Sequence, residues 1–179
     1  MTDQERKPTP LLGLLPSDVS PVILLVLGEE SGTVIGILTD MGCALSEVAR
    51  RRESTTYRVK RNSADFLIVM GGYGSSSIAS ALHELVISGC RRFVMAGTCG
   101  ASSHHSLGKV YLIRRASVNP VGGPGGMGFY LHFEPGKEFS PSPVLLEAAR
   151  PLGLEPNPSL LISSDAFYGF GGVLNQDKK

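Results

Sequence analysis

Two apolar runs, each followed directly by glycines and hydroxyl residues, constrain the fold of this chain most. The first run, residues 66–70, leads into a Gly-Gly-Tyr-Gly turn and then into a stretch with helical periodicity. The second run, residues 92–96, leads into Gly97 and Thr98. In α/β proteins such junctions place free backbone N–H groups at the carboxyl ends of strands, where anions and small ligands bind. The pattern therefore predicts an α/β fold with a small-molecule site at one edge of a sheet.

Apolar runs, an alternating stretch at residues 55–60 and helical periodicities elsewhere in the chain supply the remaining elements of such a fold. Their order predicts a mixed, twisted central sheet flanked by helices. We expect strands at residues 21–27, 55–60, 66–70, 92–96, 109–113 and 160–162, and helices across residues 34–41, 78–86 and 142–150.

Length and composition are those of an ordinary globular protein. The 179 residues fit one domain, so we expect a tail and lead-in segment at 1–20, a single α/β domain at 21–170 and a frayed tail at 171–179. The formal net charge is +1, and there is no Trp. These values argue against a nucleic-acid partner, because neither a basic surface nor an aromatic stacking platform is indicated.

The three cysteines, Cys43, Cys90 and Cys99, are odd in number and have no Cys-x-x-Cys spacing. This argues against structural disulfides and against a zinc site, and favours a reducing compartment. The apolar run at residues 22–27 is too short to span a bilayer. We therefore expect no membrane insertion and a cytoplasmic location, with an organelle left open.

The turn at residues 71–77 has two possible roles. Its backbone N–H groups could hold a phosphate or a carboxylate, or it could be a plain strand-to-helix turn with a serine cap. Ser77 stands where a dinucleotide-binding fingerprint has its third glycine, so a nicotinamide cofactor is not expected. The first two alternatives stay open.

Other polar clusters also allow more than one interpretation. The Thr98 hydroxyl could donate to an oxyanion or a sugar, or the turn could serve tight packing, with Cys99 as a small buried hydrophobe. Residues 50–52 are three arginines, of which one could bind phosphate while at least two are solvated charges. Phe167 could offer an aromatic face to a ligand or pack in the core. The neighbouring pair of histidines at 104–105 lacks a third ligand nearby in sequence, so no metal site is expected.

Five stretches of the chain, taken in their order and spacing, carry a resemblance to a known family. They are residues 26–29, 52–58, 72–85, 96–101 and 163–168, and they extend along nearly the whole chain. Together they resemble the nucleoside phosphorylase family, which includes uridine phosphorylases and hexameric purine nucleoside phosphorylases. The resemblance implies a pentosyltransferase that cleaves the N-glycosidic bond of uridine or of a purine nucleoside, with phosphate as co-substrate and with no other cofactor.

The same resemblance implies roles for individual residues. Gly28 and Thr98 would contact phosphate, and Arg52 would reach the phosphate of a neighbouring subunit, which implies a homo-oligomer. Phe167 would stack on the base or the sugar. The base pocket would be lined by Cys99 and Gly100.

The chain also departs from the family pattern. Gly32 and Met95 stand where the family has phosphate-binding arginines, and Leu11 stands where many relatives have a sugar-binding His. Because the chain ends before the family's ribose-binding segment, we expect a phosphorylase-like fold that is truncated at its carboxyl end. No catalytic residue can be assigned.

Two hypotheses about function remain open. In one, the chain is a nucleoside phosphorylase, or a hydrolytic variant that does not need tight phosphate binding. In the other, it is a catalytically decayed relative that acts as a structural or binding subunit of a larger complex. Glu29 and Glu30 bear on this choice, because carboxylates near the phosphate pocket repel an anion.

Overall fold

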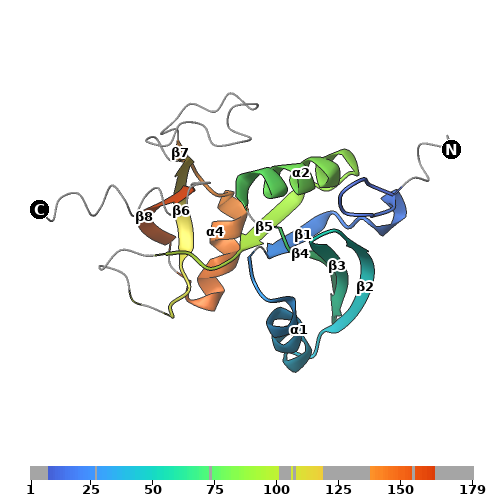
Figure 1. The fold of residues 1–179 in the computed structure, drawn as a ribbon. Coiled ribbons are helices and arrows are strands. Elements are labelled where there is room, and N and C mark those ends of the chain that lie inside the picture. Colours follow the sequence, from blue (N-terminus) through green and yellow to red (C-terminus); the bar gives the residue numbers. More distant parts are fainter. Residues whose placement is uncertain are drawn as a thin grey trace, which may run out of the picture. The chain divides into compact units, whose positions relative to one another are not determined.

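The computed structural model describes residues 8–26, 28–72, 74–100, 106, 108–118, 138–154 and 156–163. The chain forms two compact units, residues 1–99 and 100–179 (Figure 1). The first unit contains η2 (Pro16–Asp18), β1 (Val22–Val26), α1 (Ser31–Asp40), β2 (Ala44–Arg51), β3 (Ser54–Arg61), β4 (Ala64–Met70), α2 (Gly74–Ile87) and β5 (Arg92–Ala96). The second contains β6 (Leu112–Val118), β7 (Glu138–Phe139), α4 (Pro143–Ala149), η3 (Arg150–Leu152) and β8 (Pro156–Ser163).

A five-stranded mixed sheet with the order β2-β3-β4-β1-β5 forms the centre of the first unit. Strands β2, β3 and β4 make an antiparallel meander, whereas β1 runs parallel to both β4 and β5. Val26 lies opposite Met70 on one side and opposite Ala96 on the other. The carboxyl ends of β4, β1 and β5 therefore meet at one edge of the sheet, which is where ligands bind in open α/β sheets.

Alternation along β4 explains why its sequence is an unbroken apolar run. Leu67 and Val69 belong to a buried cluster with Leu85 of α2, whereas Ile68 belongs to a second cluster that Leu38 of α1 packs against. Side chains alternate between the two faces of a strand. Helices α1 and α2 therefore cover opposite faces of the sheet, and both faces of β4 are buried (Figure 1).

A segment ahead of β1 packs on the same face as α2. Leu12 and Leu14 are fully buried in the cluster that contains Leu85. The buried carboxylate of Glu84, on α2, accepts hydrogen bonds from the backbone N–H groups of Leu11 at 2.8 Å and of Leu12 at 2.9 Å. This stretch, expected to be a lead-in segment, thus contributes residues to the core of the first unit.

The second unit has a smaller mixed sheet with the order β7-β6-β8. Strand β6 is parallel to β8 and antiparallel to β7. Across β6 and β7, Arg115 Nε donates to Glu138 Oε2 at 2.7 Å, and this hydrogen bond is the main cause that lowers the pKa of the Glu138 carboxyl. Both side chains are exposed, so the pair contributes little to stability.

The predicted class, an α/β fold of mixed sheet and flanking helices, is confirmed. The three expected helices are present, but the strands divide between two sheets. Strands β2 and β7 were not predicted, and β6 begins at Leu112 where a strand was expected from residue 109. The predicted strands were identified by apolar runs or, for β3, by alternation, whereas β2 is mostly exposed and β7 is only a two-residue exposed strand.

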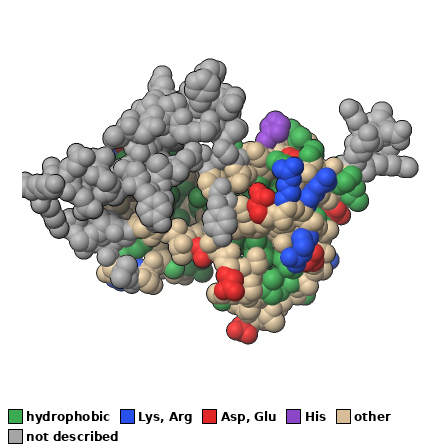
Figure 2. Space-filling model, in the orientation of Figure 1, with side chains coloured by type: hydrophobic (Ala, Val, Ile, Leu, Met, Phe, Trp, Pro, Cys, Tyr) green, Lys and Arg blue, Asp and Glu red, His purple; other side chains and the backbone are tan. Residues whose placement is uncertain are grey.

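The surface carries charges of both signs. On the face shown in Figure 2, acidic and basic side chains of the described residues are interspersed, in keeping with the net charge of +1. Among the described ranges, no helix is long and apolar enough to cross a membrane.

Candidate functional site

The candidate site begins where β1 and β5 end side by side. Gly28 follows β1 and has a φ of +73°, a conformation that favours glycine because it lacks a Cβ atom. Glu29, the next residue, is half-buried, and Thr98 lies two residues beyond the end of β5 with an exposed side chain. The parallel register of β1 and β5 thus carries both loops to the same edge of the sheet.

A hydrogen bond joins these two loops. The backbone N–H of Thr98 donates to Oε1 of Glu29 at 2.7 Å. A carboxylate that accepts from a backbone N–H forms a charge-assisted bond, which is shorter and stronger than a neutral one. The structure therefore brings the loops of Gly28 and Thr98 together, and it shows one backbone donor of this edge already bound to an anionic oxygen.

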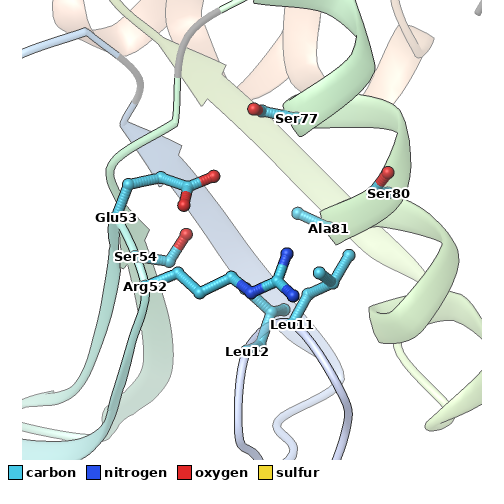
Figure 3. A pocket seen from close by; sticks show the side chains of 8 residues that line it. All are labelled: Leu11, Leu12, Arg52, Glu53, Ser54, Ser77, Ser80 and Ala81. Atoms are coloured by element: carbon cyan, nitrogen blue, oxygen red, sulfur yellow. The ribbon is translucent and has the colours of Figure 1, made fainter.

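Arg52 lies elsewhere in the first unit, in the turn between β2 and β3. Its φ of 52° is in the left-handed region, which costs a residue with a Cβ atom about 1–2 kcal/mol. Its guanidinium points into a pocket of about 200 Å³, toward Leu11 (Figure 3). The pocket is lined by Leu11, Leu12, Arg52, Glu53, Ser54, Ser77, Ser80 and Ala81.

This pocket gathers two positions that the resemblance places near substrate, Arg52 and Leu11. It is not lined by Gly28 or Thr98, so the three expected phosphate ligands do not meet in this pocket. A separate position for Arg52 is what a residue needs if it serves the site of a neighbouring subunit.

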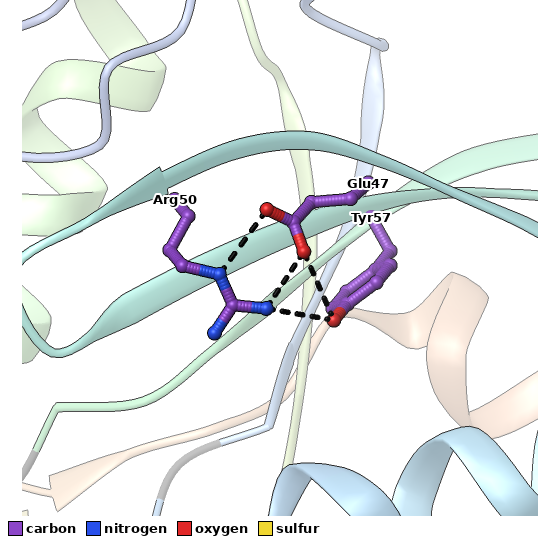
Figure 4. A network of polar contacts seen from close by, with 3 residues as sticks. All are labelled: Glu47, Arg50 and Tyr57. Atoms are coloured by element: carbon purple, nitrogen blue, oxygen red, sulfur yellow. Dashed lines mark hydrogen bonds and ion pairs between the residues drawn. The ribbon is translucent and has the colours of Figure 1, made fainter.

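The two arginines that precede Arg52 are engaged within the chain. Arg50 donates to the Glu47 carboxylate at 3.2 Å and 2.7 Å and to the Tyr57 hydroxyl at 3.5 Å (Figure 4). The hydrogen bond with Arg50 lowers the pKa of the Glu47 carboxyl, and the same bond raises the pKa of Arg50. Arg51 donates to the carbonyl of Thr9 at 3.4 Å.

Arg52, in contrast, has no hydrogen-bond or ion-pair partner among the residues that the structure describes. Of the three neighbouring arginines, it is therefore the one available to a ligand.

The glycine turn after β4 packs closely against the turn between β2 and β3. A Cβ atom on Gly71 would lie 1.9 Å from the carbonyl oxygen of Glu53, and Gly71 donates its N–H to the Val26 carbonyl at 3.4 Å. The turn thus lies directly against the β2–β3 turn that carries Arg52. These contacts require glycine at position 71.

The three residues expected near the base and the sugar are not brought together by anything that the structure describes. Cys99 is exposed at the end of the first unit, so its alternative assignment as a buried hydrophobe is wrong. Gly100 begins the second unit and has no atom within 4 Å of the position of a Cβ atom. Phe167 lies outside the described residues, as do the two histidines at 104–105.

Thiol labelling distinguishes the cysteines. Cys99 is exposed, whereas Cys90 is fully buried and its thiol donates to the Ser20 carbonyl at 3.2 Å. Burial raises the pKa of Cys90, against a smaller effect of the Arg91 charge, and so reduces the reactive thiolate. We expect iodoacetamide to label Cys99 in the folded protein and Cys90 only after unfolding, as measured by peptide mass spectrometry. Rapid labelling of Cys90 in the folded protein would contradict this packing.

The contacts of three residues were not predicted from the sequence, two in the Arg52 pocket and one at the Thr98 loop. Ser77 was considered only as part of the turn, and Ser80 was not considered, yet both line the Arg52 pocket. Glu29 was expected only to repel an anion, yet it binds the Thr98 N–H. Its contact could have been inferred, since residues that follow adjacent parallel strands lie at the same edge of a sheet.

The described part of the chain contains no group of three or more His, Cys, Asp and Glu side chains placed to hold a metal ion.

Solved structures of nucleoside phosphorylases have the same fold as this chain. Uridine phosphorylase from Vibrio fischeri superposes with a TM-score of 0.71 at 18% identity, covering 97% of this chain and 73% of that one. Purine nucleoside phosphorylase from Toxoplasma gondii, solved in complex with immucillin-H, gives a TM-score of 0.68 at 23% identity, covering 94% and 66%. At such identities the likeness concerns the fold.

Sequence relatives are uridine phosphorylases. The chain is 31% identical to that of Escherichia coli over 163 residues, and 27% identical to that of Thermococcus kodakarensis over 153 residues. The resemblance to the nucleoside phosphorylases is therefore confirmed. The match covers 88% of this chain but 61% of the Escherichia coli enzyme, so the chain spans less than two thirds of that relative's length. No protein-family model matches the chain.

Proposed function

We propose that the chain binds phosphate and a nucleoside, and that it acts as a nucleoside phosphorylase. The observation that carries the proposal is the Thr98 N–H, which lies at the same edge of the sheet as the loop of Gly28 and donates to the Glu29 carboxylate at 2.7 Å. A donor that binds a carboxylate oxygen at the carboxyl edge of a parallel sheet is suited to a phosphate oxygen as well. Uridine is the first substrate to test, since the sequence relatives are uridine phosphorylases.

The proposed reaction places modest demands on the protein. A phosphate oxygen forms a bond to the anomeric carbon of the ribose while the bond from that carbon to the base nitrogen breaks. The bonding electrons leave with the base, which takes up a proton, and the products are the free base and ribose 1-phosphate. Since the transition state is oxocarbenium-like, catalysis consists of positioning phosphate and stabilising charge on the departing base.

Arg52 is proposed to complete the phosphate site of a second copy of this chain. Its guanidinium has no partner among the described residues and points into a pocket apart from Gly28 and Thr98. A guanidinium binds phosphate through paired, charge-assisted hydrogen bonds. The working protein would therefore be at least a dimer.

Replacing Arg52 with glycine separates this role from backbone strain. Relief of the left-handed conformation and the extra chain entropy of glycine nearly cancel, so the free energy of unfolding should change by less than about 1 kcal/mol. Loss of the guanidinium should weaken phosphate binding by about 2 kcal/mol or more, roughly 30-fold, by isothermal titration. Asn62→Gly is the matched control, because Asn62 also has a φ of 52° in the β3–β4 turn.

If Arg52→Gly and Asn62→Gly bind phosphate as tightly as the unmodified chain, the role proposed for Arg52 is wrong. Analytical ultracentrifugation of the same samples tests the dimer.

Phosphate binding is expected to be weak by the standard of the family. Gly32 and Met95 replace two arginines, and each lost charge partner of a desolvated anion typically costs about 2–5 kcal/mol. A structural or binding subunit without turnover would release no base, which separates the two hypotheses.

A further inference from the structure

We infer that Glu29 is an internal competitor of phosphate, which occupies the Thr98 N–H when no ligand is bound and thereby lowers the affinity of the site for phosphate. The inference rests on the proposed function, because it concerns the same phosphate site. It adds a competitor that belongs to the chain itself.

The contact between Glu29 and Thr98 is specific in its geometry. The two residues are 69 positions apart in sequence, and they meet because β1 and β5 are parallel neighbours whose last residues, Val26 and Ala96, lie opposite each other. Gly28, with its positive φ, turns the chain immediately before Glu29. The 2.7 Å separation from Thr98 N to Glu29 Oε1 is typical of a charge-assisted hydrogen bond.

Within the ranges that the structure describes, Glu29 has no ion-pair partner. The Thr98 N–H is the one group there that donates a hydrogen bond to it. The adjacent carboxylate behaves differently. Oε2 of Glu30 accepts a hydrogen bond from the Thr33 hydroxyl, in the first turn of α1, at 3.3 Å. Two neighbouring side chains of equal charge thus have different partners, and of the two it is Glu29 that contacts Thr98.

Occupancy by Glu29 has a direct consequence for an incoming anion. A backbone N–H has one hydrogen and makes one well-aligned hydrogen bond, so a phosphate oxygen must displace the carboxylate oxygen before it can bind there. The displaced carboxylate, once free of its donor, stays near the phosphate and repels it. Removing Glu29 should relieve both costs, and we expect phosphate binding to tighten about tenfold or more.

The experiment compares Glu29→Ala with Glu30→Ala in the full chain. Isothermal titration with inorganic phosphate should show at least about a tenfold tighter dissociation constant for Glu29→Ala, and a change of less than about threefold for Glu30→Ala, whose exposed charge is screened. Amide hydrogen exchange of Thr98, measured by NMR without phosphate, should accelerate in Glu29→Ala and stay unchanged in Glu30→Ala.

The outcomes separate this inference from the proposed function. If the unmodified chain binds phosphate and Glu29→Ala binds it no more tightly, Glu29 is not a competitor and the inference alone is overturned. If no variant binds phosphate, both the inference and the proposed function are overturned. If Glu29→Ala binds phosphate tightly but releases no base from uridine or inosine, the inference stands and the proposed activity fails.

Discussion

Gly71→Ala is expected to destabilise the first unit by about 3–5 kcal/mol, a large part of the stability of a typical domain. The added Cβ atom would lie 1.9 Å from the Glu53 carbonyl oxygen, and the φ of Gly71 is +102°, a conformation that alanine rarely adopts. Relief requires movement of the β2–β3 turn, because the clashing atom is backbone. Urea unfolding followed by circular dichroism measures the change.

Gly89→Ala is the matched control for this effect. Gly89 has a φ of +104°, nearly that of Gly71, but no atom lies within 4 Å of the position of its Cβ. We expect Gly89→Ala to cost about 1–2 kcal/mol, from backbone strain alone. Equal losses for the two variants would mean that the β4–α2 turn does not approach the Glu53 carbonyl as closely as the structure shows.

Glu84→Ala is expected to cost about 2–4 kcal/mol, the second large effect. The buried carboxylate of Glu84 accepts hydrogen bonds from the N–H groups of Leu11 and Leu12, and Leu12 is 1% exposed. Without Glu84 these donors lose their partner, and an unsatisfied buried N–H typically costs about 1–3 kcal/mol. The segment before β1 should then detach from α2, which hydrogen exchange and the free energy of unfolding in urea both measure.

His83→Ala is the control, because His83 precedes Glu84 on the same helix and its side chain is exposed. It should change the free energy of unfolding by less than about 0.5 kcal/mol. If Glu84→Ala is as mild as His83→Ala, the carboxylate does not hold the segment. Because Leu11 lines the Arg52 pocket, loss of this segment would also open that pocket.

How well each helix or strand could be predicted depended on how strong its hydrophobic pattern is. The runs of β1 and β4 are apolar because both faces of these central strands are covered. They were predicted, as was β5, an edge strand with an apolar run whose side chains are partly or fully exposed. The edge strand β2 carries polar side chains and was missed, since its strand structure depends on pairing with β3. The division of the strands between two sheets likewise depends on which strands pair in the folded chain, so it was not predicted.

The candidate site was predictable to the extent that it follows from strand order. Gly28 and Thr98 lie after neighbouring parallel strands, so their loops meet as expected. Among the residues that the structure describes, Arg52 has no partner, whereas Arg50 and Arg51 do. This could not be read from sequence, because Glu47, Tyr57 and Thr9 come close to Arg50 and Arg51 through the fold. The Glu29 contact was missed because a carboxylate at an expected anion site was taken only as repulsive.

The most direct test of the proposed phosphorylase activity is to incubate the purified chain with uridine and, separately, with inosine, with and without inorganic phosphate. Free base and ribose 1-phosphate are measured by chromatography and ³¹P NMR. Phosphorylase activity predicts release of base that depends on phosphate and forms ribose 1-phosphate in equal amount, faster in Glu29→Ala wherever phosphate is below saturation. No release from either nucleoside at millimolar phosphate, in a folded protein, would contradict it, and release without ribose 1-phosphate would make the chain a hydrolase.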